Sequence, residues 1–185
     1  IGTLKLADRL SREQLYDYFT AFGFGTKTKI NLPGESFKPI RPAAKWYPID
    51  KGNISFGQGV SVNMVQMARA YASIYNGGVL WQPVIVDKIV NPDNEKILFQ
   101  TVPEPKRINF KFSSDKRMVN MREGVVEEGT AKSAMLEGIK VGGKTGTSQI
   151  YDFTAKKYSW DNVVCSFIGA VPSNDPAFVI MVVIE

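Results

Sequence analysis

Residues 141–149 have the sequence Val141-Gly142-Gly143-Lys144-Thr145-Gly146-Thr147-Ser148-Gln149, and this stretch decides the fold. It places one lysine and several small hydroxylated residues among glycines. The two threonines, followed by Ile150, favour an extended strand. The same letters also fit a phosphate-binding loop, so the choice between these two structures decides the function as well.

The phosphate-loop interpretation rests on residues 138–145, which match G-x-x-x-x-G-K-[ST] letter for letter. That motif binds phosphate when a strand precedes the loop and a helix follows it, because the helix N-terminus then faces the phosphates. Here the expected order is reversed, with residues 131–137 helical and residues 145–150 extended. Nucleotide binding is therefore the weaker alternative, and a helix over residues 145–155 would revive it.

In the strand interpretation, Lys144 and Gly146 point to one face because side chains alternate along a strand. The lysine supplies a fixed positive charge, and the glycine leaves room for a nucleophile and a carbonyl to approach. The hydroxyl of Thr147 can donate to a carboxylate, and its N–H can face a developing oxyanion, a contact worth about 3 kcal/mol. An edge strand can also pair with an extended peptide. We therefore expect an edge strand that receives a carboxylate-bearing substrate.

The composition is that of a globular domain, with 185 residues, 44% hydrophobic and 22% charged. A net charge of +5 favours anionic partners slightly, but no basic run is dense enough to indicate nucleic acid. Histidine is absent, which excludes Ser-His-Asp and Cys-His catalysis within these residues. The single cysteine, Cys165, lies in an apolar stretch, so we expect it to be buried. No run approaches the roughly 18 apolar residues of a membrane span.

Helices dominate the expected N-terminal part. Residues 1–10 form one helix, and Ser11–Gln14 resembles a capping box that opens a second, which ends at Gly23. The expected apolar faces comprise Ile1, Leu4, Ala7 and Leu10 in the first helix, and Leu15, Tyr18, Phe19 and Phe22 in the second. Residues 24–54 are expected to form a long glycine- and proline-rich loop, which is usually functional.

A third helix is expected over residues 62–75, ended by Asn76-Gly77-Gly78, with Ser61 at its entry as a cap. Its expected buried side consists of Val65, Ala68, Ala72 and Tyr75. Residues 83–90 and 96–101 then form a hairpin that turns at residues 91–94.

The last third is expected to begin with a helix capped by Ser113 or Ser114 and running to about Glu127. Three strands follow, near residues 141–150, 162–171 and 177–185, and the turn at residues 172–176 joins the last two as an antiparallel pair. Neither end of the sequence carries a helix cap or a turn, so we expect both ends to cut through a domain.

Lys144-Thr145-Gly146-Thr147 resembles the third motif of penicillin-binding proteins and serine β-lactamases. Five further motifs occur in the order typical of class B penicillin-binding proteins: Phe22–Gly25, Leu32–Glu35, Ser55–Val60, Asn76–Gly78 and Val125–Ala131. Residues 165–172 resemble the division-specific branch. Two segments depart from the family pattern, Val62–Met64 and Ser36–Lys38, and neither touches the proposed chemistry.

The resemblance implies an α+β fold, an antiparallel sheet covered by helices, in which residues 1–185 are the C-terminal part of one transpeptidase domain. It implies D,D-transpeptidation of peptidoglycan stem peptides through a serine acyl-enzyme, without cofactor or metal. The resemblance also assigns roles to residues. Lys144 would hold positive charge near the nucleophile, and Thr145 and Thr147 would bind the carboxylate of D-Ala-D-Ala or of a β-lactam. The Thr147 N–H would form half of the oxyanion hole. Gly146 would provide clearance, and Gln149 would contact the substrate or face solvent.

The resemblance also implies that the remaining catalytic motifs, Ser-x-x-Lys and Ser-x-Asn, lie upstream of this chain. Ser113–Lys116 and Ser61–Asn63 match them by letters, but in the wrong order, and both fit helix caps better. The expected partners are the N-terminal half of the same protein and cell-wall division proteins, on the outer side of a membrane anchor. The loop at Gly129-Thr130 is either a simple helix break or, as in the family, part of the site floor.

Alternatives remain open at this stage. A β-lactamase or β-lactam sensor has the same fold and differs in its deacylation rate. A scaffold of the cell-wall machinery that has lost its serine is a third hypothesis, and the upstream sequence would identify it.

Overall fold

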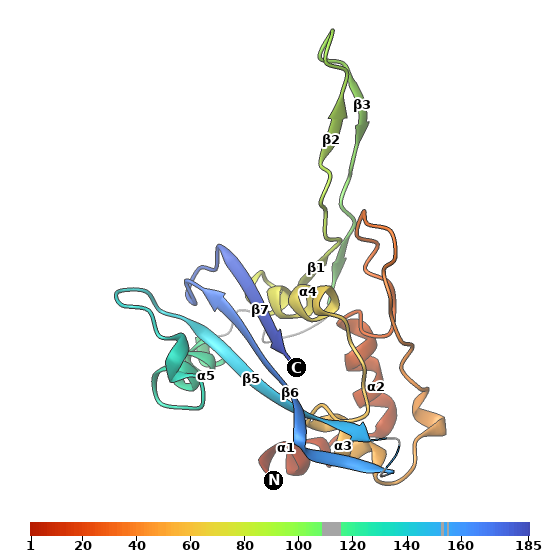
Figure 1. The fold of residues 1–185 in the computed structure, drawn as a ribbon, viewed down its shortest axis with the longest axis vertical. Helices are drawn as coiled ribbons and strands as arrows, with labels where there is room; N and C mark the ends of the chain where they lie inside the picture. Colours follow the sequence, from red (N-terminus) through yellow and green to blue (C-terminus); the bar gives the residue numbers. More distant parts are fainter. Residues whose placement is uncertain (109–115, 153, 155) are drawn as a thin grey trace. The chain divides into compact units, whose positions relative to one another are not determined.

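The computed structural model describes residues 1–108, 116–152, 154 and 156–185. The chain forms two compact units. The first comprises Ile1–Ser73 and Val79–Asn109, and the second comprises Ile74–Gly78 and Phe110–Glu185. Figure 1 shows the helices and strands along the chain.

The first unit is mainly helical. It contains α1 (Gly2–Ala7), α2 (Arg12–Ala21), the 3-10 helix η1 (Ala43–Lys45) and α3 (Asp50–Ser55), and α4 (Met64–Tyr75) runs from it into the second unit. Its core consists of the buried residues Leu15, Ala43, Trp46 and Ile54. The indole Nε1 of Trp46 donates to the carbonyl of Arg41, so this large side chain is buried without leaving a polar atom unpaired.

The capping box at the start of α2 is confirmed, because Ser11 Oγ accepts from the N–H of Gln14 and the Gln14 side chain accepts from the N–H of Ser11. Gly23 follows the helix at a φ of +81°, as expected for a glycine stop. The expected apolar face was only partly right. Tyr18 is exposed, whereas Tyr16 and Phe19 pack on the core.

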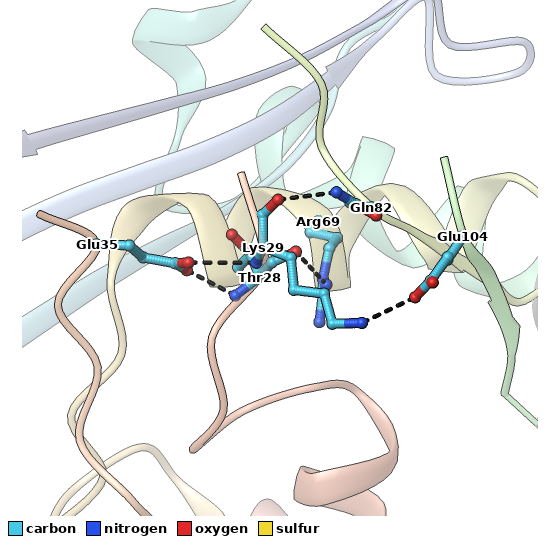
Figure 2. A network of polar contacts seen from close by, with 6 residues as sticks. All are labelled: Thr28, Lys29, Glu35, Arg69, Gln82 and Glu104. Carbon is cyan, nitrogen blue, oxygen red and sulfur yellow. Dashed lines mark hydrogen bonds and ion pairs between the residues drawn. The ribbon is translucent and has the colours of Figure 1, made fainter. Parts of the chain in front are cut away.

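The expected loop over residues 24–54 is interrupted by η1 and by α3, which periodicity alone did not indicate. Its first half is held by Glu35, whose carboxylate accepts hydrogen bonds from the N–H groups of Thr28 at 2.6 Å and Lys29 at 3.2 Å. The carbonyls of the same two residues accept from Arg69 and Gln82 (Figure 2). Lys29 adopts a φ of +62°, which costs a residue other than glycine about 1–2 kcal/mol, and these bonds offset that cost.

Replacing Glu35 with glutamine is expected to destabilise the protein by about 1 kcal/mol, because hydrogen bonds to a charged acceptor become bonds to a neutral one. Burial of the carboxylate opposes ionisation, but the bonds from Thr28 and Lys29 outweigh it and lower the pKa of Glu35. The loss should therefore be full above the ordinary value of 4.5 and shrink as the pH falls below it. Urea unfolding at pH 7 and pH 4 measures both.

Glu104→Gln is the matched control for that substitution. Glu104 pairs with Lys29 at 2.9 Å in the same network, but both side chains are largely exposed, and such pairs contribute little. Equal effects of the two substitutions would contradict the role assigned to Glu35.

The buried side of α4 differs from the expected one. Val65, Ala68, Ala72 and Tyr75 are only half-buried, while the buried residues are Gln66, Ala70, Tyr71 and Ser73. Gln66 can be buried because its side chain forms two hydrogen bonds: Oε1 accepts from the N–H of Asn63, and Nε2 donates to the Thr26 carbonyl. In return, the backbone N–H of Gln66 donates to Asn63 Oδ1. Asn63, rather than Ser61, therefore caps this helix.

Two small antiparallel ribbons follow α4. The expected hairpin is confirmed as β2 (Lys88–Val90) paired with β3 (Ile97–Gln100), although both strands are shorter than expected. The second ribbon pairs β1 (Val79–Trp81) with β4 (Pro105–Arg107), and the sequence did not indicate it because its strands have three residues each.

The second unit contains α5 (Lys116–Glu127), the 3-10 helix η2 (Lys132–Ala134) and a three-stranded sheet. The strands β5 (Gly142–Asp152), β6 (Lys157–Val171) and β7 (Phe178–Ile184) are antiparallel in the order β5-β6-β7, which confirms the expected α+β arrangement of this part. Val126 of α5, Ala131 and Val141 form the buried cluster, against which Phe167 and Val171 of β6 pack.

Two expectations in this unit had other outcomes. Cys165 is exposed rather than buried, because it lies opposite Thr147 on β6, beyond the part of that strand that the buried cluster covers. The cap at Ser113 or Ser114 lies outside the described residues.

Candidate active site

β5 is an edge strand of the sheet, as predicted for the Lys-Thr-Gly-Thr stretch. Pairing with β6 places Lys144 opposite Ile168 and Gly146 opposite Ser166, whereas Thr145 and Thr147 lie opposite Phe167 and Cys165. Opposed residues share a face of a sheet. Lys144 and Gly146 therefore belong to one face and the two threonines to the other, so a ligand along the free edge meets both sets.

The phosphate-loop interpretation is wrong, because residues 145–152 continue β5 as a strand. In the described residues that follow Lys144-Thr145 no helix begins, so no helix N-terminus there can face a bound phosphate. The strand interpretation, in which these residues line a sheet edge, is the one that the structure supports.

Lys144 is an exposed side chain whose ammonium donates to the carbonyl of Thr145 at 2.8 Å. An exposed lysine contributes little to packing, and the three N–H donors of its ammonium can turn toward a ligand or another polar group. The side chain is thus accessible to a ligand at the edge of β5.

Glycines let the side chains of β6 pass close to the backbone of β5. A Cβ atom at Gly143 would lie 2.4 Å from the ring of Phe167, and one at Gly146 would lie 2.6 Å from Ser166 Oγ. The first contact involves a packed ring and the second a hydroxyl that can rotate. Gly143 is therefore required for packing. At Gly146, a side chain would fit only if the Ser166 hydroxyl turned away. Its predicted role in admitting a substrate stays a prediction.

Gln149 lies further along β5, opposite Val163, and is half-buried. Its Nε2 atom is buried and has no hydrogen-bond partner among the described residues. Such a donor costs free energy unless a ligand or water satisfies it, which favours a contact role over a purely solvent-facing one.

One contact of this site was missed from the sequence. The Oγ1 atoms of Thr130 and Thr145 lie 2.8 Å apart, which brings the loop after α5 to the edge strand. The two residues are 15 positions apart, and no local pattern connects them.

A buried carboxylate anchors the start of β5. Glu123 of α5 accepts from the hydroxyl of Ser173 and from Lys140 at 3.1 Å, and the N–H of Ser173 donates to the Lys140 carbonyl at 2.9 Å. These bonds join α5, the residues before β5 and the turn after β6. Among the described residues, no cluster of three or more histidine, cysteine, aspartate or glutamate side chains is placed to hold a metal ion.

The chain matches the family model described as the penicillin binding protein transpeptidase domain over residues 1–185. It is 37% identical over 184 residues to stage V sporulation protein D of Bacillus subtilis and covers 28% of that protein. It is 32% identical to the probable peptidoglycan D,D-transpeptidase PenA of Neisseria meningitidis, covering 30% of it. All of this chain takes part in both matches, so it spans less than a third of these relatives.

Among solved structures, the chain is similar to penicillin binding protein 3 of Mycobacterium tuberculosis in complex with aztreonam, with a TM-score of 0.92 and 30% identity. All of this chain and 42% of that one are covered. The transpeptidase domain of Burkholderia pseudomallei penicillin-binding protein 3 gives a TM-score of 0.82 at 30% identity, over 100% of this chain and 52% of that one. In the part of this chain that the structure describes, no helix is both long and apolar enough for a membrane span.

Proposed function

Because this chain belongs to the transpeptidase-domain family of penicillin-binding proteins along its whole length, we propose that it is the C-terminal part of a single catalytic domain in a division-specific class B peptidoglycan D,D-transpeptidase. The observation that carries the proposal is the edge position of β5, so that Lys144 on one face and Thr145 and Thr147 on the other all lie along the free edge of the sheet. Extended peptides bind at such edges.

Each residue of this strand has a proposed role. The ammonium of Lys144 holds positive charge beside the nucleophile and the Ser-x-Asn groups. The hydroxyls of Thr145 and Thr147 donate to the terminal carboxylate of the stem peptide, and the N–H of Thr147 faces the oxyanion. Gly146 leaves space for the acyl group. Gln149 donates an N–H of its buried Nε2, which has no hydrogen-bond partner among the described residues, to the bound peptide.

In the proposed reaction, one stem peptide is first attached to a serine as an ester. That serine attacks the carbonyl of the penultimate D-Ala, and the bond to the terminal D-Ala breaks as its nitrogen takes up a proton. An amine of a second stem peptide then attacks the ester, which forms the cross-link and frees the serine. The serine and its Ser-x-Asn neighbour belong to the N-terminal part of the same protein, in line with the small share of its relatives that this chain spans.

β-Lactams are the proposed inhibitors, because their carboxylate and strained amide imitate the D-Ala-D-Ala terminus. The structures similar to this chain include complexes with aztreonam and with ampicillin. We further propose that the full-length protein is anchored in the cytoplasmic membrane, with this domain on the outer side among the proteins of cell-wall synthesis during division.

Intact-mass spectrometry of the full-length protein before and after incubation with benzylpenicillin tests the proposal. We expect one lasting penicilloyl adduct on a peptide upstream of this chain, and no adduct on residues 1–185 expressed alone. Hydrolysed drug without an adduct would instead identify a β-lactamase. Intact drug without an adduct would identify a scaffold that has lost its serine.

A further inference from the structure

The loop that follows α5 brings a second threonine to the active-site strand. Thr130 Oγ1 lies 2.8 Å from Thr145 Oγ1, well within hydrogen-bond distance. Thr130 is exposed, and its main chain is not part of a helix or strand. No regular element fixes Thr130, so the position of its hydroxyl beside β5 depends on the residues on either side of it.

Those neighbours fix Thr130 from both sides. A Cβ atom at Gly129 would lie 2.9 Å from the backbone of Val125, so only glycine lets the chain turn this tightly after the helix. On the other side, the N–H of Ala131 donates to the Val125 carbonyl at 3.0 Å, and Ala131 is buried with Val126. Thr130 is thus presented to Thr145 by a rigid turn.

The direction of the bond follows from counting protons. A threonine hydroxyl has one proton to donate and two lone pairs that accept. When the Thr145 hydroxyl donates a hydrogen bond to a substrate carboxylate, its hydrogen bond with Thr130 persists only if Thr130 is the donor. A carboxylate therefore selects one orientation for both hydroxyls, and the two bonds polarise each other along the chain.

We propose that Thr130 is a positioning residue that aims the Thr145 proton at the carboxylate of the substrate or of a β-lactam. This inference rests on the proposed function, because it assigns a supporting group to the carboxylate contact. Without the Thr130 hydroxyl, the Thr145 proton loses its fixed direction while the backbone of β5 stays in place.

The test compares Thr130→Val with Thr130→Ser in the full-length protein. Valine keeps the branched shape and removes the hydroxyl, and serine keeps the hydroxyl. The second-order rate of adduct formation is measured by intact mass for benzylpenicillin and for its neutral methyl ester. For Thr130→Val we expect a rate about 5- to 10-fold lower with the acid, because bonds to charged acceptors are the stronger ones, and a change of less than about 2-fold with the ester. Thr130→Ser should restore the rate with the acid.

Selectivity for the acid separates positioning from a structural role. Equal losses with the acid and the ester, or a loss that serine does not restore, would assign Thr130 to the stability of the loop and overturn the inference. An unchanged rate with the acid would overturn it as well. If the wild-type protein forms no adduct, the proposed function itself fails, so the two failures are distinct.

Discussion

Replacing Lys144 with glutamine is expected to slow acylation of the full-length protein by benzylpenicillin by about 1,000-fold, while leaving its folding stability nearly unchanged. The size of the loss follows from removing a fixed positive charge from the reacting centre, where it stabilises the negative charge that develops during acylation. Stability should hold because Lys144 is exposed, and its ammonium donates to the carbonyl of its own neighbour, Thr145. Glutamine keeps most of the length of the side chain and its ability to donate.

The measurement is the rate of penicilloyl adduct formation, followed by intact mass, together with the unfolding temperature. Lys45→Gln is the matched control, since it removes the same charge from an exposed position in η1 and should leave the rate unchanged. A Lys144→Gln variant that acylates at the wild-type rate would remove this lysine from the chemistry. A rate loss accompanied by a large drop in unfolding temperature would point to a structural role instead.

The features that could be predicted from the sequence are those encoded locally. The strand at Lys144–Thr147 follows from short-range residue preferences, and the antiparallel partner of β7 follows from the turn chemistry at residues 172–176. The capping box at Ser11 and the hairpin turn after Val90 are likewise set within four or five residues. Each of these features could be predicted because the contacts that form it are made by the same nearby residues that make up the sequence pattern.

The remaining features depend on contacts between distant segments. α4 buries Gln66 because that side chain reaches the carbonyl of Thr26, 40 residues away, and an apolar periodicity does not register a polar residue satisfied in this way. Cys165 is exposed because the buried cluster stops short of it. The contact between Thr130 and Thr145 depends on the turn at Gly129. The glycine is visible in the sequence, but the segment that the turn brings Thr130 against is not.

The anchoring carboxylate, Glu123, shows how strongly this strand depends on its surroundings. Glu123 has an exposed fraction of 7%, and it accepts from Ser173 and from Lys140. The hydrogen bond from Ser173 is the main cause that lowers the pKa of Glu123, while its burial acts in the opposite direction. The carboxylate therefore binds its partners as an anion, and these bonds join three segments around the start of β5.

Glu123→Gln should reduce the free energy of unfolding by about 2 kcal/mol at pH 7, because bonds to a buried anion become bonds to a neutral amide. A lowered folded-state pKa gives stability that is full above the ordinary value of 4.5 and is lost as the pH falls through the folded value. The hydrogen bond from Lys140 to Glu123 raises the pKa of Lys140 above its ordinary value of 10.5, so that contribution is lost only in strong alkali.

The difference between wild type and Glu123→Gln should thus be constant between about pH 5 and pH 10 and shrink in acid. Urea unfolding at pH 7 and at pH 3.5 measures it. Glu128→Gln is the control, because that side chain is exposed just after α5 and the substitution should change stability by less than about 0.5 kcal/mol. A difference that persists undiminished in acid would show that the shape of Glu123, rather than its charge, holds the segments together.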